Sequence, residues 1–237
     1  MQLKFMFADG GGDEMKKGKF FVIEGTDGAG KATQAQLLCN ALETEGRPIM
    51  KLSFPCYGTP ACAPVEMYLK GAFGPKPEDV NAYTASLFYA VDRFASYRTG
   101  WGQFLKDGGI IVADRYTTSN AVHQCSKLPS EQWDEYLDWL FDLEYGKLGL
   151  PAPDKVLFLS MPVEVSERLM SGRYHGNEGK KDIHEKDVAF LQRSRAAGVY
   201  CCEKFGWNRI ECARNGTPRS IEDIVAEVLA EVEKALG

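Results

Sequence analysis

The chain has 237 residues, of which 44% are hydrophobic and 26% charged, and a formal net charge of −5. This composition is that of a globular chain long enough to bury a core, and it excludes a disordered or fibrous protein. The negative charge argues against coating of nucleic acid or an anionic membrane by bulk electrostatics, so we expect neither as a partner.

The N-terminal segment, residues 1–14, contains the run Gly-Gly-Gly-Asp and no strand or helix pattern. We expect a flexible extension there, followed by a single domain over residues 15–237, because no repeat or linker interrupts the rest. The seven cysteines form no CxxC pair. With no apolar leader, they favour free thiols in a reducing compartment, so the predicted location is cytoplasmic.

Short β-rich segments alternate with longer helical patterns from residue 20 onward. The predicted strands are residues 20–24, 49–54, 110–113, 155–159 and 209–212. The predicted helices are residues 31–45, 80–106, 130–145, 162–170, 185–205 and 220–236, with Ser130 as the N-cap of the third. This alternation predicts an α/β fold with a parallel sheet and helices on both faces. The first, third and fourth strands are almost continuously apolar, which places them at the centre.

The first strand is followed by a stretch that matches the phosphate-loop pattern G-x-x-x-x-G-K and opens a helix. Its glycines allow backbone N–H groups to face phosphate oxygens, and Lys31 can reach the outer phosphates. Ala32 stands where a Ser or Thr hydroxyl usually joins a magnesium shell, although a water could take that place. The predicted nucleotide-binding residues are Gly25, Thr26, Gly28, Ala29, Gly30, Lys31, Ala32 and Thr33.

The third predicted strand ends in Asp114 and Arg115. Because neighbouring parallel strands bring their carboxyl ends to one edge of a sheet, these two side chains should lie beside the phosphate loop. We expect Asp114 to face a metal ion or its waters and Arg115 to face phosphates.

Together these residues resemble the thymidylate kinase family, bacterial type, over residues 16–207. The matching stretches are EGTDGAGKATQ, the pair Phe54-Pro55, LFYAVDR at 87–93, DRYTTSN at 114–120 and DIHE at 182–185. The resemblance implies a P-loop nucleoside-monophosphate-kinase-like fold with a five-stranded parallel sheet, a short mobile flap at about residues 171–182 and commonly a homodimer. It also implies Mg²⁺-dependent transfer of the γ-phosphoryl of ATP to dTMP in deoxynucleotide biosynthesis.

The resemblance also implies roles for individual residues. The catalytic residues would be Asp27, Lys31, Arg115 and Arg173, and the metal ligands Asp114 and Asp27. Since the loop carries Gly28 where some relatives have an arginine, positive charge would come from Arg173 first, from the nucleotide-binding Arg168, or from Lys180 or Lys181. The acceptor pocket would be formed by Asp27, Phe54, Pro55, Tyr57, Phe88, Tyr89, Arg93, Arg115, Ser119, Asn120, His123, Gln124 and Glu185.

Three of these positions carry particular expectations. In LFYAVDR, Arg93 would point toward the acceptor base, and helical spacing favours Tyr89 over Phe88 as the ring against that base, because residues four apart share a face. His123 replaces a tyrosine that in many relatives helps to exclude ribose, so exclusion of a 2′-hydroxyl is not predicted. On helix 80–106, the side bearing Phe94, Tyr97 and Trp101 could be a partner face or core.

Two other functions stay open on sequence alone. A deoxynucleoside kinase would need a carboxylate base to deprotonate a 5′-hydroxyl, and we would expect that base at the end of the second strand. The second strand ends in Phe54-Pro55 instead, but Asp27 could serve as the base, so this function stays open. A non-catalytic nucleotide sensor is suggested by Ala32.

Overall fold

The computed structural model of the chain describes residues 18–174, 183–185 and 187–237. Five parallel strands form one sheet in the order β2-β3-β1-β4-β5. They are β1 (Lys19–Gly25), β2 (Ile49–Ser53), β3 (Ile110–Asp114), β4 (Lys155–Ser160) and β5 (Asn208–Glu211). The three apolar strands lie at the centre as predicted, because both of their faces are covered.

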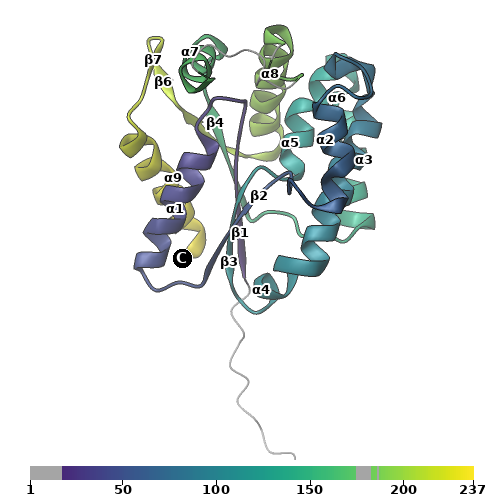
Figure 1. Cartoon of the computed structure of the whole chain (residues 1–237). Helices are drawn as coiled ribbons and strands as arrows, with labels where there is room; N and C mark the ends of the chain where they lie inside the picture. Colours follow the sequence, from purple (N-terminus) through teal and green to yellow (C-terminus); the bar gives the residue numbers. More distant parts are fainter. Residues whose placement is uncertain (1–17, 175–182, 186) are drawn as a thin grey trace, which may run out of the picture.

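Helices cover the sheet on both faces (Figure 1). On one face, α1 (Lys31–Thr44) and α9 (Ile221–Leu236) pack against β1 residues such as Phe21 and Ile23. The other face is covered by α3 (Ala82–Ser96), α4 (Gly102–Lys106), α5 (Thr117–His123), α6 (Trp133–Phe141) and α8 (Val188–Phe205). Phe20 and Val22 point to that second face. Successive side chains of β1 therefore pack alternately into two separate hydrophobic cores, one on each face of the sheet.

The remaining elements lie around this sandwich. Helix α2 (Ala63–Leu69) packs on α3, and α7 (Val163–Tyr174) lies near the carboxyl ends of the strands. Short 3-10 turns occur at η1 (Pro60–Cys62), η2 (Pro77–Asp79), η4 (Cys125–Lys127) and η5 (Ser130–Gln132). An antiparallel hairpin joins β6 (Ala213–Arg214) to β7 (Thr217–Pro218). The sequence patterns did not predict α2, α5 or this hairpin, which are short.

Two predicted helices are interrupted. The segment predicted as one helix over 80–106 contains the π-helical turn η3 (Tyr97–Trp101) between α3 and α4, and Asn81 caps α3 by accepting from the N–H of Thr84 at 2.8 Å. The predicted N-cap at Ser130 is wrong, because this residue lies inside η5 and makes no capping bond. Helix α6 continues into a second π-helical turn, η6 (Asp142–Lys147).

The first residues of the predicted flap are helical. Helix α7 continues to Tyr174, so residues 171–174 are helical, since nothing in Ser-Gly-Arg-Tyr forces the chain to turn. Residues 175–182 of the flap and the predicted extension, residues 1–14, lie outside the described residues. Within the described parts of the chain, no helix combines the length and apolar character needed to cross a membrane.

Candidate active site

The phosphate loop connects the end of β1 to the start of α1. Gly30 is the N-cap of α1 with a φ of 87°, and Gly28 has a φ of 78°, both in the left-handed region that glycine adopts without strain. A Cβ at Gly28 would lie 2.9 Å from the carbonyl oxygen of Ser166 in α7. The loop therefore passes too close to α7 for any side chain at position 28.

Lys31 is folded into this loop. Its side chain is buried, with Nζ donating to the carbonyl of Thr26 at 2.8 Å and lying 3.8 Å from Oδ1 of Asp27. Ala32 and Thr33 are exposed in the first turn of α1. The first turn thus offers backbone N–H groups, the partial positive charge of the helix start and one lysine, the combination that binds phosphate.

Glu24 is a site residue that the sequence patterns missed. This last side chain of β1 before the loop is 0% exposed and accepts hydrogen bonds from the N–H of Gly25 at 2.9 Å, Thr118 Oγ1 at 2.7 Å and Ser119 Oγ at 2.8 Å. It therefore fastens the start of α5 to the phosphate loop. The signal was available: a carboxylate in the otherwise apolar run Phe-Phe-Val-Ile-Glu needs partners when buried.

Arg115 lies between the phosphate loop and α5. Its backbone is left-handed, with φ 69°, which is rare for a residue with a side chain and is typical of functional sites. The guanidinium pairs with Asp27 through Nη2, while Nη1 lies 3.4 Å from Ser119 Oγ and 3.0 Å from Nε2 of His123. This geometry holds a cation at the carboxyl edge of the sheet, beside the loop.

The charge states of this cluster follow from its contacts. Burial would raise the pKa of Asp27, but Arg115 and Lys31 outweigh it and hold that pKa well below the ordinary value. Burial and the nearby Arg115 lower the pKa of Lys31, although Asp27 partly restores it. Burial, together with Arg115, lowers the pKa of His123 well below its ordinary value. Near neutral pH, Asp27 is therefore ionised and His123 is a neutral imidazole.

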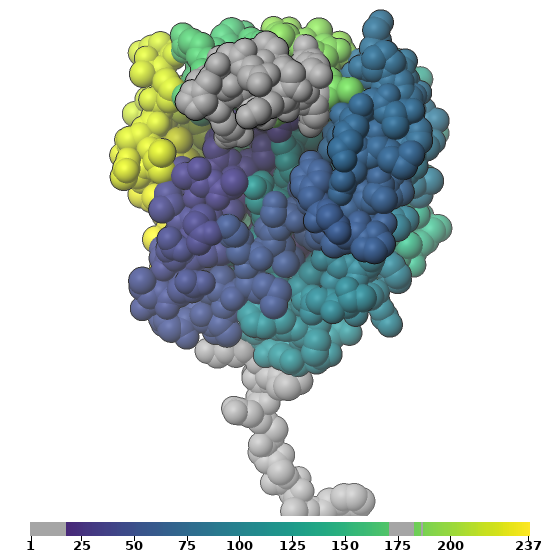
Figure 2. Space-filling view, in the orientation of Figure 1, coloured from purple at the N-terminus to yellow at the C-terminus, as the bar shows by residue number. Residues whose placement is uncertain are grey.

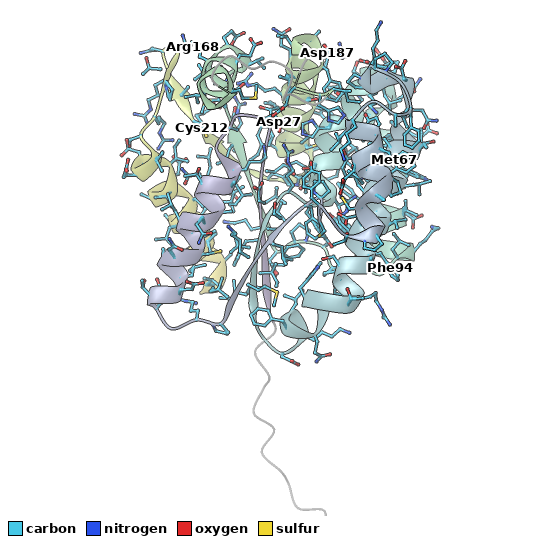
Figure 3. All side chains as sticks on the ribbon, in the orientation of Figure 1. Asp27, Met67, Phe94, Arg168, Asp187 and Cys212 are labelled. Carbon is cyan, nitrogen blue, oxygen red and sulfur yellow. The ribbon has the colours of Figure 1, made fainter. Side chains whose placement is uncertain are left out.

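A cavity of about 420 Å³ opens beside Arg115. In Figure 2 the surface is hollowed between the purple α1 side and the blue residues of α2 and α3, and Figure 3 shows Asp27 above the sheet between these two sides. The cavity is lined by Asp27, Ser53, Phe54, Pro55, Tyr57, Leu69, Tyr89, Asp114, Arg115, Ser119, Asn120, His123, Gln124, His184 and Glu185. Its size suits a small nucleotide.

Most of the predicted acceptor residues meet in this wall, but Phe88 and Arg93 do not. Phe88 packs against Tyr68 and Phe73, at centroid distances of 6.5 and 5.6 Å, while the neighbouring ring of Tyr89 lines the cavity. The favoured ring, Tyr89, therefore reaches the cavity, although Arg93, from which the spacing was counted, does not line it.

Arg93 was expected to point toward the acceptor base, and the structure places it elsewhere. Its side chain is 1% exposed, with Nε donating to Oε2 of Glu144 at 2.7 Å and Nη2 to Oε1 at 2.5 Å. Glu144 is fully buried and also accepts from Thr117 Oγ1 at 2.6 Å. In this structure the guanidinium is committed to an internal ion pair, which supports the wall of the cavity through Asn120 and Thr117.

His184 and Leu69 line the cavity although neither was predicted as a site residue. The imidazole of His184 is 5% exposed and stacks on that of His123, with centroids 5.8 Å apart and planes 18° apart. Burial, with Lys127 next, lowers the pKa of His184 to about 3. Leu69 and His184 come from α2 and from the stretch before α8, so only the folded chain brings them to α5.

The two predicted flap arginines lie in or near α7. Arg168 is exposed and donates through Nη2 to the carbonyl of Gly216 in the β6–β7 hairpin at 2.6 Å, and in Figure 3 it lies to the upper left of Asp27. Arg173 lies in the last turn of α7, and its side chain is outside the described residues.

Of the two carboxylates predicted to bind magnesium, Asp114 has an oxygen that is available to a ligand. Oδ1 of Asp114 is buried without a hydrogen-bond partner among the described residues, whereas Asp27 is engaged by Arg115 and Lys31. No cluster of three His, Cys, Asp or Glu side chains that could form a metal cage occurs in the described part of the chain. Mg²⁺ commonly uses one or two carboxylates with waters and phosphate oxygens, so a single carboxylate such as Asp114 is compatible with a magnesium site.

Comparison with known proteins decides the family. The profile described as thymidylate kinase matches residues 23–215. The chain belongs to the thymidylate kinase family. A thymidylate kinase of Mycobacterium tuberculosis is 31% identical over 73% of this chain and 81% of its own, and a probable thymidylate kinase of Thermococcus gammatolerans is 30% identical over 92% and 98%.

The solved structure of a thymidylate kinase from Candida albicans shares the fold, with a TM-score of 0.67 at 20% identity over 92% of each chain. Membership of this family makes the protein a phosphotransferase, as the phosphate loop predicted. The loop, Arg115 and the neighbouring cavity thus lie where a phosphotransferase needs a donor site beside an acceptor site.

Proposed function

We propose that the protein transfers the γ-phosphoryl group of ATP to dTMP, giving ADP and dTDP, as a cytoplasmic step of deoxynucleotide biosynthesis. One observation carries this proposal: Arg115 stands between the phosphate loop and a cavity of about 420 Å³. A cation in that position can contact the phosphate of an acceptor nucleotide while the donor phosphates lie on the loop.

The acceptor phosphate is already an anion, so the residues must align and neutralise two phosphates, and no base is required. Lys31 and the N–H groups of the first turn of α1 would hold the donor phosphates. Arg115 would hold the acceptor phosphate, and Asp27 would keep Arg115 oriented through their ion pair. The end of β2 contributes Ser53, Phe54 and Pro55 to the cavity and no carboxylate, which disfavours a nucleoside kinase.

In this proposal, Asp114 would hold the Mg²⁺ ion through the oxygen that has no hydrogen-bond partner among the described residues, and waters would replace the hydroxyl that Ala32 lacks. When bound, the metal would neutralise charge on the donor phosphates. Asp27 serves the ion chiefly by its charge, since its carboxylate already pairs with Arg115.

The bacterial-type assignment is also part of the proposal. The close approach of Gly28 to Ser166 supports it, because the loop has no room for an arginine of its own. A cation for the transition state would then come from Arg173 at the end of α7, with Lys180 or Lys181 as further candidates, and Arg168 would contact ATP only after leaving Gly216.

The base would lie against Tyr89, with Ser119, Asn120 and Gln124 of α5 and the adjoining turn facing its edge and His123 near the sugar. Tyr57, Phe54 and Glu185 would complete the wall. Arg93 and Phe88 would support this pocket from behind, through Glu144 and Tyr68 respectively.

We further propose a homodimer formed through α3. Leu87, Val91 and Phe94 are 45%, 55% and 39% exposed and follow one another at spacings of four and three, so they form an apolar stripe on one side of the helix. Trp101, by contrast, is 1% exposed and belongs to the core. The proposed dimer face therefore lies nearer to the start of the predicted helix 80–106 than the side bearing Phe94, Tyr97 and Trp101.

The proposed function is tested by measuring ADP release from MgATP with dTMP, dUMP, UMP, CMP and thymidine offered separately. Metal-dependent turnover that is fastest with dTMP supports it. Turnover with thymidine would establish a nucleoside kinase instead. Confirmed nucleotide binding with no product from any acceptor would establish a sensor.

A further inference from the structure

The five residues that follow β2 form part of the wall of the acceptor cavity. We call residues 54–58 the β2 loop, and three of them, Phe54, Pro55 and Tyr57, line the cavity. Tyr89 of α3 lines the same cavity. The position of the β2 loop relative to α3 therefore sets the space that is left for an acceptor nucleotide.

The two ends of the β2 loop are held by different elements. At its start, the N–H of Phe54 donates to the carbonyl of Asp114 in β3 at 3.0 Å. At its end, the N–H of Gly58 donates to Oε1 of Glu66 in α2 at 2.9 Å. Gly58 is exposed, so a water molecule can satisfy this N–H when Glu66 moves away. The second end is therefore the weaker attachment.

The middle of the β2 loop is held from α3 by Asp92. Its Oδ2 accepts a hydrogen bond from the N–H of Cys56 at 2.8 Å, and the residue is 1% exposed. Its other oxygen, Oδ1, is buried without a hydrogen-bond partner among the described residues, and the guanidinium of the adjacent Arg93 is paired with Glu144. A buried carboxylate with so little compensation is costly, and burial accordingly raises the pKa of Asp92 against the effect of the Cys56 N–H. Such a group calls for a functional explanation.

Helical geometry links this attachment to the cavity. Tyr89 and Asp92 are three residues apart in α3, so they lie at neighbouring positions on one side of the helix. Tyr89 lines the cavity. Asp92 holds Cys56, and both chain neighbours of Cys56 line that cavity as well. One buried hydrogen bond therefore fixes the β2 loop relative to the ring of Tyr89.

We propose that Asp92 is a positioning residue of the acceptor site, which holds the β2 loop at the distance from Tyr89 that the acceptor monophosphate requires. Asp92 is not among the lining residues, so it acts through Cys56 and the two neighbours of that residue. This inference rests on the proposed function and adds to it a residue outside the cavity wall.

The kinetic test compares the KM for dTMP and the KM for ATP in variants of Asp92. Asp92→Ala removes the acceptor of the Cys56 N–H, and Asp92→Leu also removes it while filling a similar space. Both should raise the KM for dTMP about tenfold. The KM for ATP and kcat at saturation should stay within about twofold, because Arg115 and the phosphate loop are unchanged. Asp92→Asn keeps an oxygen that can accept the same bond, so its KM for dTMP should stay within about twofold of that of the unmodified protein.

Asn81→Ala is the matched control on the same helix. The side chain of Asn81 also accepts a backbone hydrogen bond at 2.8 Å, from the N–H of Thr84, but Asn81 is exposed and does not line the cavity. Its loss should leave the KM for dTMP within about twofold. A variant that only unfolds more easily has less active enzyme and a lower apparent kcat, whereas its KM is unchanged. An unchanged KM in Asp92→Ala and Asp92→Leu, or an equal rise in Asn81→Ala, would overturn the proposal.

Two further readouts do not depend on turnover. Titration calorimetry measures the Kd for dTMP, which should rise about tenfold in Asp92→Ala and stay within about twofold in Asp92→Asn. Labelling with a thiol reagent follows the β2 loop itself, because Cys56 is half-buried and the other six cysteines are buried. Cys56 should be labelled about tenfold faster in Asp92→Ala than in the unmodified protein, since the loop opens more often. An unchanged labelling rate would show that the loop stays in place without Asp92 and would overturn the proposal.

The binding measurement separates this inference from the proposed function. If the unmodified protein binds dTMP but does not phosphorylate it, the proposed function fails, while the ratio of the two Kd values still decides the role of Asp92. Equal Kd values in the unmodified protein and Asp92→Ala would exclude the positioning role even if dTMP is a good substrate. A protein that binds no nucleoside monophosphate would overturn both.

Discussion

The buried pair of Arg93 and Glu144 should be a main support of the acceptor site, and Glu144→Gln tests this. Both side chains are almost fully buried, and Glu144 also accepts from Thr117 and, at 3.4 Å, from Asn120. Gln preserves the size of the side chain but leaves the guanidinium without its counterion. Removing one partner of a buried pair commonly costs about 3–5 kcal/mol, because the remaining charge is uncompensated.

We expect Glu144→Gln to lower the free energy of unfolding by about 3 kcal/mol, near the lower end of this range, because the Gln carbonyl can still accept one hydrogen bond from Arg93. In a chain of this size, that loss lowers Tm by about 6 to 12 °C. Urea unfolding at pH 7.5 measures the free energy directly. Asp142→Asn is the matched control, because Asp142 and its partner Lys147 are 59% and 66% exposed, and it should cost less than about 1 kcal/mol. A loss below about 1 kcal/mol for Glu144→Gln would refute the structural role and leave Arg93 available to the acceptor base.

Three further outcomes follow from the site and the surface. Arg115→Ala should lower kcat with MgATP and dTMP at least about 100-fold, because it removes the cation between the two phosphates; a variant keeping a tenth of the rate would contradict this role. Ala32→Ser should change kcat by less than about threefold, because water can complete the Mg²⁺ shell; a tenfold gain would show that the loop is impaired. Val91→Asp should sediment as a monomer, because a charge in an apolar interface is unfavourable; an unchanged dimer would exclude the α3 stripe.

The central strands and the phosphate loop could be predicted from sequence because their signals are local. Residues 20–24, 110–113 and 155–159 are almost continuously apolar, with Glu24 and Lys155 as the exceptions, as is typical of parallel strands that are buried on both faces. The loop spacing, the strand before it and the helix after it lie within a few residues of one another.

Arg93, Glu24 and His184 show where local reasoning ends. Helical spacing placed Arg93 on the same face as Tyr89. In the structure, Arg93 instead pairs with Glu144, which lies in a π-helical turn that no pattern predicted. His184 reaches His123 and Tyr68 only through the packing of three separate segments. These roles depend on contacts between residues far apart in the chain, which residue spacing does not encode.

Transfer of a labelled phosphoryl group tests the central claim most directly. The purified protein is given dTMP, Mg²⁺ and ATP labelled at the γ-phosphate, and the products are separated. The label should appear in the β-phosphate of dTDP in equal amount to the ADP formed, and should disappear when the metal is chelated. Label that appears only in inorganic phosphate, or that enters thymidine rather than dTMP, would contradict a thymidylate kinase.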